Sequence, residues 1–258
     1  MEASVVMFLT CSLFSMHTSA YRKHFYVKQG MTWPNAQVYC RELHDDLSTT
    51  SNAELIKLSR NPSLTFGFYW IGLYRESQTP TVWRWIDGEE ATNISWQPGQ
   101  PHTLHELCAF ISKSNNRAFD MSCFLSIPFY CMEIYELILV QEERTWDEAL
   151  AHCKENSMNL AGLTSEIIME EAMTKSESAL TDVVWMGLRF IAGQWFWVKG
   201  ITDDEGFKGW SAEGEPALNQ RCGVYNRTQN VLEAADCSRR LSFLCVRRIK
   251  EATNESDA

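Results

Sequence analysis

The chain contains nine cysteines, and eight of them form two sets of four with matching spacing. The first set has gaps of 68, 15 and 8 residues and the second has gaps of 69, 15 and 8: Cys40, Cys108, Cys123 and Cys131, then Cys153, Cys222, Cys237 and Cys245. Thiols serve mainly as disulfides or metal ligands, and the absence of a C-x-x-C pair argues against structural zinc. Disulfides are therefore predicted for these eight, although spacing alone leaves three pairings open in each set.

The tryptophans follow the same repeat as the cysteines. Five in the first half have counterparts 112 to 115 residues later: Trp33, Trp70, Trp83, Trp85 and Trp96, then Trp146, Trp185, Trp195, Trp197 and Trp210. A period of this length suits a complete domain with its own core. The sequence therefore predicts a duplicated domain, residues 21–133 and 134–248, followed by an acidic tail at 249–258. Repeated tryptophans more often fill cores than stack on ligands, so we expect these in the two cores.

Local signals place the same elements in each copy. Helices are predicted over Trp33–Leu43, with Pro34 near its start, and over Trp146–Glu155. A capping-box pattern beginning at Ser51 opens a second helix over residues 55–59, and residues 165–173 take its place in the second copy. Aromatic and β-branched residues predict strands at 68–73, 81–86, 183–188 and 194–198. Turn-forming residues dominate 87–106, which predicts a long ordered loop, the kind of segment that often carries function.

The N-terminal segment predicts export from the cell. Residues 1–20 combine an apolar run with a small-residue end, which is typical of a signal peptide cleaved after Ala20. No other segment approaches the roughly 18 to 20 apolar residues of a transmembrane helix, so we expect a secreted, extracellular protein without membrane insertion. The exported cysteines then meet an oxidising compartment. Three sequons, at Asn93, Asn226 and Asn254, are candidate N-glycosylation sites.

The charge distribution excludes one class of partner. The net charge is −10, and residues 134–258 hold 13 basic and 21 acidic side chains, against 10 and 11 in residues 21–133. Phosphate and sulfate binding depends on concentrated Lys and Arg, so a nucleic-acid or heparin partner is not expected.

Together these features resemble the C-type lectin-like domain family. The resemblance is carried by the four cysteines, by the strand motif Trp70-Ile71-Gly72-Leu73 with its counterpart at 185–188, and by a Trp, Gly and Pro in each long loop. It implies an α+β fold of two tandem domains, each with two helices, antiparallel sheets and a long ligand-face loop. It also implies four disulfides: Cys40–Cys131, Cys108–Cys123, Cys153–Cys245 and Cys222–Cys237.

In the family's sugar-binding members, loop oxygens hold a calcium ion that exchanges its remaining positions for sugar hydroxyls. By this resemblance the candidate calcium and carbohydrate residues of the first copy are Gln100, Glu106 and Asp120. His102 and Phe119 stand where the family has oxygen donors. Two alternatives remain: these polar groups stabilise the loop, or His102, His105 and Glu106 hold a softer metal.

The second copy keeps less of this pattern. The triplet reads Glu215-Pro216-Ala217, so only Glu215 remains as a donor there. Gln220 replaces the following Glu, and Glu233-Ala234 occupies the Asn-Asp position. The acidic run Asp203-Asp204-Glu205 is either an auxiliary calcium site or a solvated charge cluster.

The predicted function is binding rather than catalysis. The sequence contains no G-x-S-x-G, H-E-x-x-H or glycine-rich phosphate loop, so we do not expect an enzyme. The resemblance implies extracellular recognition of a glycan, with or without calcium. The alternative is a calcium-independent module that binds a protein ligand.

Overall fold

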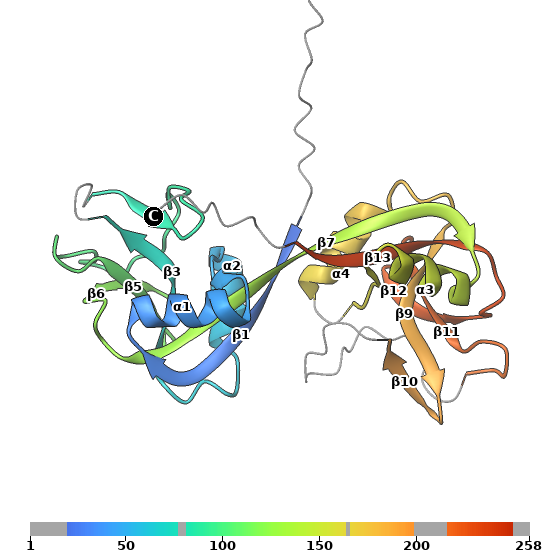
Figure 1. Ribbon diagram of the computed structural model, residues 1–258, viewed down its shortest axis with the longest axis horizontal. Helices are drawn as coiled ribbons and strands as arrows, with labels where there is room; N and C mark the ends of the chain where they lie inside the picture. The colour runs from blue at the N-terminus through green and yellow to red at the C-terminus, as the bar shows by residue number, and fades with distance from the viewer. Residues whose placement is uncertain (1–19, 77–80, 164–165, 199–215, 250–258) are drawn as a thin grey trace, which may run out of the picture.

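The computed structural model describes residues 20–76, 81–163, 166–198 and 216–249, which form two lobes (Figure 1). The first lobe contains β1 (Ala20–Met31), α1 (Trp33–Leu43), β2 (Asp46–Leu47), α2 (Asn52–Ser59), β3 (Phe68–Arg75), β4 (Trp83–Trp85), β5 (Cys108–Ser112) and β6 (Ala118–Met121). The second lobe contains α3 (Trp146–Glu155), β8 (Asn159–Leu160), α4 (Glu166–Ser176), β9 (Val183–Ile191), β10 (Gln194–Trp197), β11 (Cys222–Asn226), β12 (Val231–Ala235) and β13 (Leu241–Ile249). One long strand, β7 (Ile127–Arg144), runs through both lobes.

The sheet is organised around β7. Within the described residues the strands pair in the order β12-β11-β9-β13-β7-β3-β5-β6, with β1, β2, β4, β8 and β10 pairing from the sides. Almost all pairs are antiparallel, as predicted; the exceptions are single parallel contacts of β3 with β7 and of β9 with β13. No helix in this part of the chain is long and apolar enough to cross a membrane.

The junction between the lobes is a continuous piece of sheet. Residues 134–136 of β7 pair with the start of β1 and also with the end of β13. Tyr21, at the start of β1, packs into the core of the second lobe. Arg248 of the second lobe donates to Asp45 at 2.7 Å and lies 3.2 Å from Glu133. The boundary expected at residues 133/134 therefore falls inside a strand, with no linker.

The helices begin where the local signals predict. Pro34 lies in the first turn of α1, and Ser51 caps α2 with both bonds of a capping box. Thr145 and Glu148 form a second capping box at the start of α3, which the sequence analysis did not identify. Each box satisfies backbone N–H groups that have no partner inside the helix.

The repeated tryptophans lie mostly in the two cores and make matching hydrogen bonds. Trp70 donates from Nε1 to the carbonyl of Met31 at 3.1 Å, and Trp185 donates to that of Arg144 at 2.9 Å. Close packing explains why the W-x-G-L motif contains a glycine. A Cβ at Gly187 would lie 2.5 Å from the Leu160 carbonyl oxygen, because the strand passes directly against β8.

Each lobe contains two disulfides, and the bonded pairs are those that the resemblance implies. Cys40–Cys131 and Cys153–Cys245 close segments of 91 and 92 residues, while Cys108–Cys123 and Cys222–Cys237 each close 15. The longer pair fixes the first helix of each lobe to its last strand. The tandem α+β architecture predicted from the sequence is confirmed.

Candidate functional site

The long loop of the first lobe, between β4 and β5, folds over the end of β6. Asp120 of β6 is fully buried, and its carboxylate accepts hydrogen bonds from the backbone N–H groups of His102 and Thr103 at 3.1 to 3.2 Å. A carboxylate can be buried only if such donors replace its water. Asp120 therefore anchors the loop from inside.

The guanidinium of Arg75, on β3, lies beside this carboxylate. Its Nη2 atom is 3.4 Å from Asp120 Oδ2, and the two side chains are 3% and 0% exposed. Arg75 also donates from Nε to the Glu106 carbonyl at 3.1 Å and stacks on Trp83, 4.8 Å from its centroid. Burial lowers the pKa of Arg75 from its usual value, and the charges of Asp120 and Glu106 oppose that shift. The chain thus supplies its own cation at this position.

The structure brings the three candidate residues of the first copy together around His102. His102 Nδ1 lies 2.9 Å from Asp120 Oδ1, 3.0 Å from Gln100 Oε1 and 3.6 Å from Glu106 Oε2. Thr103 Oγ1 donates to Glu106 Oε2 at 3.1 Å. The imidazole therefore lies at the centre of the oxygen cluster, and the Gln100–Pro101 peptide beside it is cis.

This donor set departs from what calcium requires. Calcium takes six to eight oxygen ligands, whereas here three side chains surround an imidazole and the Asp120 oxygens already accept four donors. His102, Glu106 and Asp120 offer ligand atoms within 4.8 Å of one another, a combination that suits a transition metal better. His105 is not part of that group, contrary to the softer-metal alternative.

The equivalent place in the second lobe has lost the ion pair. Ala234 occupies the position of Asp120, because Ala234 pairs with Gly223 as Asp120 pairs with Ala109 in the first lobe. Phe190 replaces Arg75, and its N–H donates to Arg221 as that of Arg75 donates to Leu107. The candidate Glu215 and the acidic run at 203–205 lie outside the described residues.

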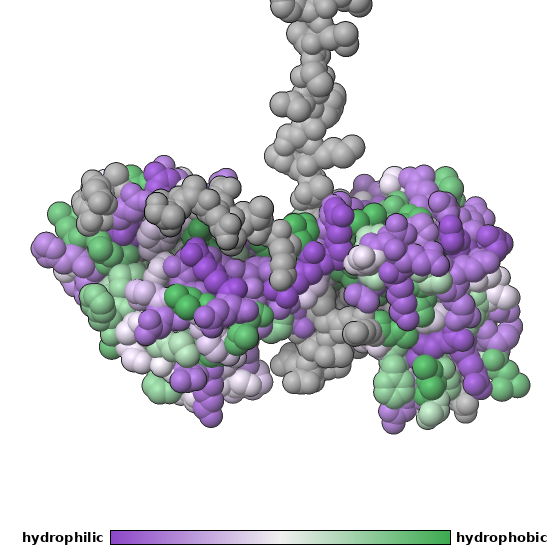
Figure 2. Space-filling model, in the orientation of Figure 1, coloured by the Kyte–Doolittle hydropathy of each residue, from purple (hydrophilic) through white to green (hydrophobic). Residues whose placement is uncertain are grey.

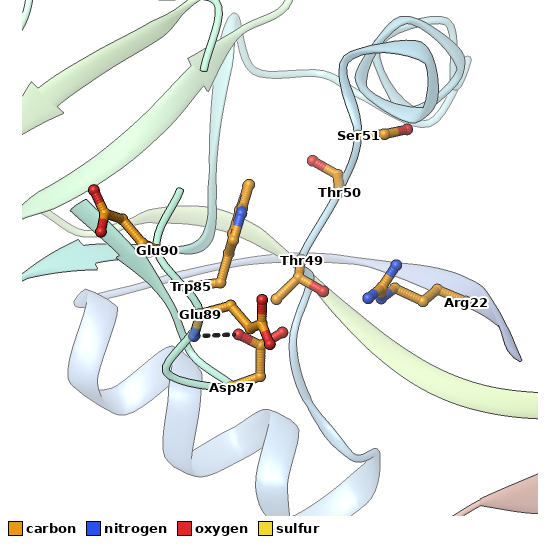
Figure 3. Close-up of a pocket in the computed structure, with 8 residues that line it drawn as sticks. All are labelled: Arg22, Thr49, Thr50, Ser51, Trp85, Asp87, Glu89 and Glu90. Carbon is orange, nitrogen blue, oxygen red and sulfur yellow. Dashed lines mark hydrogen bonds between the residues drawn. The ribbon is translucent and has the colours of Figure 1, made fainter. Parts of the chain in front are cut away.

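A second polar site, which the sequence analysis missed, lies beside the start of α2 (Figure 3). It is a cavity of about 770 Å³ lined by Arg22, Thr49, Thr50, Ser51, Trp85, Asp87, Glu89 and Glu90. These residues come from β1, from the segment before α2, and from β4 and the turn after it. No motif links them, because segments distant in the sequence contribute them.

Two of the three sequons lie in the described residues. Asn93 is exposed, whereas the amide of Asn226 donates to Glu233 at 3.1 Å and accepts from Thr228. Asn254 lies outside the described residues. Asn93 is therefore the more accessible acceptor.

Comparison with known proteins identifies the family. The model of the Lectin C-type domain matches residues 29–133 and again 142–247. The chain therefore belongs to the C-type lectin domain family, as the sequence predicted.

Several curated relatives match the chain. It is 24% identical to human lymphocyte antigen 75 over 277 residues, covering 90% of this chain and 15% of that protein. It is 36% identical to C-type lectin 1 of Hydrophis hardwickii over 110 residues, covering 39% of this chain and 66% of that protein. The chain thus spans less than two thirds of either relative's length. Among solved structures, human lithostathine is 21% identical with a TM-score of 0.40, covering 43% of this chain and 90% of its own.

Proposed function

We propose that this protein is a secreted carbohydrate-recognition protein whose first lobe does not use calcium at the long loop. Membership of a lectin domain family supports the ligand class. The apolar segment at residues 1–20 supports export, and Asn93, Asn226 and Asn254 remain proposed glycosylation sites. The described sites offer polar binding groups rather than an activated nucleophile, which favours binding over catalysis.

The buried state of Asp120 supports calcium independence. A calcium ion holds such a loop by drawing carboxylates to one point. In this chain the Arg75 guanidinium and the His102 ring already contact that carboxylate, at 3.4 and 2.9 Å. The Arg75 guanidinium balances the Asp120 charge from within the fold, so the loop has no need of an added cation.

The experiment is a glycan array and a thermal unfolding series, both run on the full chain with 5 mM calcium and then with EDTA. A ligand present at 100 times its Kd stabilises a protein by about 2.7 kcal/mol, which is several degrees in Tm. We expect glycan binding and Tm to be the same in both buffers. A Tm that rises by several degrees with calcium, or glycan binding abolished by EDTA, would contradict the proposal.

Protein recognition is the second candidate, and exposed apolar residues in the second lobe favour it. Ile191 and Phe196, 51% and 47% exposed, share one face of the β9–β10 hairpin. Figure 2 shows hydrophobic residues gathered at this end of the lobe, while hydrophilic residues cover most of the remaining face. Protein recognition would be favoured if the glycan array showed no binding. A protein partner should then bind equally well with and without EDTA, and the Phe196→Ser variant should lose that binding.

A further inference from the structure

We infer that the cavity lined by Arg22, Thr50 and Trp85 in the first lobe, named here the α2 recess, is a saccharide-binding site that works without metal. The inference rests on the proposed carbohydrate function and gives it a location. The α2 recess shares no lining residue with the Gln100, Glu106 and Asp120 cluster.

Two buried polar groups in the α2 recess have no hydrogen-bond partner among the described residues. They are the Nε–H of Arg22 and the hydroxyl of Thr50, a residue that is 8% exposed. Figure 3 shows the Thr50 hydroxyl directed toward the space in front of Trp85, with Arg22 on the far side of Thr49. Buried polar groups in native proteins are nearly always paired, and an unpaired one calls for an explanation. Ligand oxygens that accept from these groups would supply it.

Three carboxylates also line the α2 recess, with Asp87 and Glu89 close together and Glu90 on the other side of Trp85 (Figure 3). Asp87, Glu89 and Glu90 form no ion pair within the part of the chain that the structure describes. The turn that carries them is fixed, since Glu89 N donates to Asp87 Oδ1 at 3.0 Å and Trp85 N donates to the Glu89 carbonyl at 2.9 Å. Ionised carboxylates only accept hydrogen bonds, so the ligand must also offer donors.

Trp85 adds an apolar surface between these groups. Its ring is partly buried against the core of the first lobe and faces the cavity. A ligand that fits needs hydroxyls, which both donate and accept, together with one C–H face to lie on the indole. A neutral pyranose has both.

Other ligand classes fit the α2 recess less well. A sulfate or phosphate would meet three carboxylates. A lysine side chain would satisfy the carboxylates but has no acceptor for Arg22 and Thr50. The volume of about 770 Å³ lies in the range of small-molecule sites, roughly 300 to 1,000 Å³.

The second lobe does not repeat the α2 recess. Phe25 pairs with Cys131 in the first lobe as Ile138 pairs with Cys245 in the second. Three residues earlier, Tyr135 therefore occupies the position of Arg22. Thr50 is replaced by Leu163, which is fully buried in the apolar core. The α2 recess therefore predicts one saccharide site for each chain.

The test is a titration of the isotopically labelled full chain with neutral methyl glycosides in EDTA, followed by NMR. The panel is methyl mannoside, galactoside, glucoside, fucoside and N-acetylglucosaminide. We expect at least one to shift the Trp85 Nε1–H and Arg22 Nε–H signals. Thr50→Val should weaken that binding at least tenfold without lowering Tm, because the hydroxyl has no partner to lose.

Thr103→Val in the long loop is the matched control, since the same change there removes the bond to Glu106. It should leave glycoside affinity within twofold of wild type. If Thr103→Val weakens binding and Thr50→Val does not, the α2 recess is the wrong site and the carbohydrate function stands. If no glycoside binds by NMR and the array is also blank, both proposals fail.

Discussion

The two lobes share one backbone fold but differ in the side chains at the Arg75–Asp120 position and around the α2 recess. Both keep the buried tryptophans, the tight glycine and the two disulfides. At one equivalent point the first lobe buries an Arg75–Asp120 ion pair, and the second has a buried Phe190 and an alanine, Ala234, at these two positions. Apolar groups of similar volume can replace a buried ion pair without loss of stability. The same lobe fold therefore forms with either arrangement, and the ion pair of the first lobe serves to hold its long loop.

The α2 recess extends the contrast. Arg22 and Thr50 leave polar groups unpaired in the first lobe, while Tyr135 and Leu163 pack into an apolar cluster in the second. Duplication thus left one lobe with a polar cavity and the other with a closed core. Among the described residues, the exposed apolar side chains of the β9–β10 hairpin are what the second lobe offers in place of the α2 recess.

The largest expected effect comes from breaking the ion pair on one side. Asp120→Ala leaves the Arg75 charge buried without its partner, which should lower the free energy of unfolding by about 3 to 5 kcal/mol. The double variant Arg75→Phe/Asp120→Ala also removes the buried charge and should recover the part of the loss due to that charge, while the His102 and Thr103 N–H groups still lack their acceptor. Urea unfolding of both variants measures the difference. Equal instability of the single and double variants would mean that the lobes are not interchangeable here.

A smaller difference in the free energy of unfolding is expected between alanine variants of the equivalent glycines Gly72 and Gly187. A Cβ at Gly187 would lie 2.5 Å from the Leu160 carbonyl oxygen, whereas at Gly72 the equivalent Leu47 oxygen is 3.0 Å away and the nearest atom, at 2.9 Å, belongs to the Ile86 side chain. We expect Gly187→Ala to lower the free energy of unfolding by about 2 to 3 kcal/mol and Gly72→Ala by about 1 kcal/mol. Thermal unfolding of the two variants tests this order, and the reverse order would contradict it.

The smallest effect is the pH dependence that Glu54 adds in the first lobe. Burial would raise the pKa of Glu54, but the nearby His24 ring, with Nε2 3.7 Å from Glu54 Oε1, and a hydrogen bond from the Ser51 N–H outweigh it, and the pKa falls to about 2. Because the folded pKa is depressed, the stabilisation is present above about pH 4.5 and is lost as the pH falls toward 2. In the second lobe, Leu137 replaces His24.

Glu54→Gln should therefore flatten the fall in Tm of the first lobe between pH 5 and 2, by an amount equivalent to about 1 kcal/mol. Calorimetry across that range is the measurement. An unchanged acid transition in this variant would show that the Glu54 carboxylate contributes nothing.

Local signals predicted much of the fold, because the residues responsible are close in sequence. The bounds expected for α1 and α3 match the structure, since Pro34 and the cysteine-bearing helical segments act locally. The strand β1 was not predicted: it follows the apolar N-terminal segment directly, and only one of its twelve residues is buried.

The candidate site was predicted in part. The resemblance pointed to Gln100, Glu106 and Asp120, and the structure brings them together. The role of Arg75 was not apparent, because a strand arginine belongs to no calcium motif and pairs with Asp120 only through sheet register. The α2 recess was missed for the same reason, as its walls meet only in three dimensions.

The shared strand β7 fixes the separation between the two surfaces proposed for binding, the α2 recess in the first lobe and the exposed β9–β10 hairpin in the second. A flexible tether would let two lobes search for targets at many separations, but hydrogen bonds from β1 and β13 to residues 134–136 prevent that adjustment. Effective concentration at the second site is then high for targets whose epitopes match the built-in spacing and close to zero for others. The protein should therefore discriminate among multivalent surfaces by their geometry as well as by their chemistry.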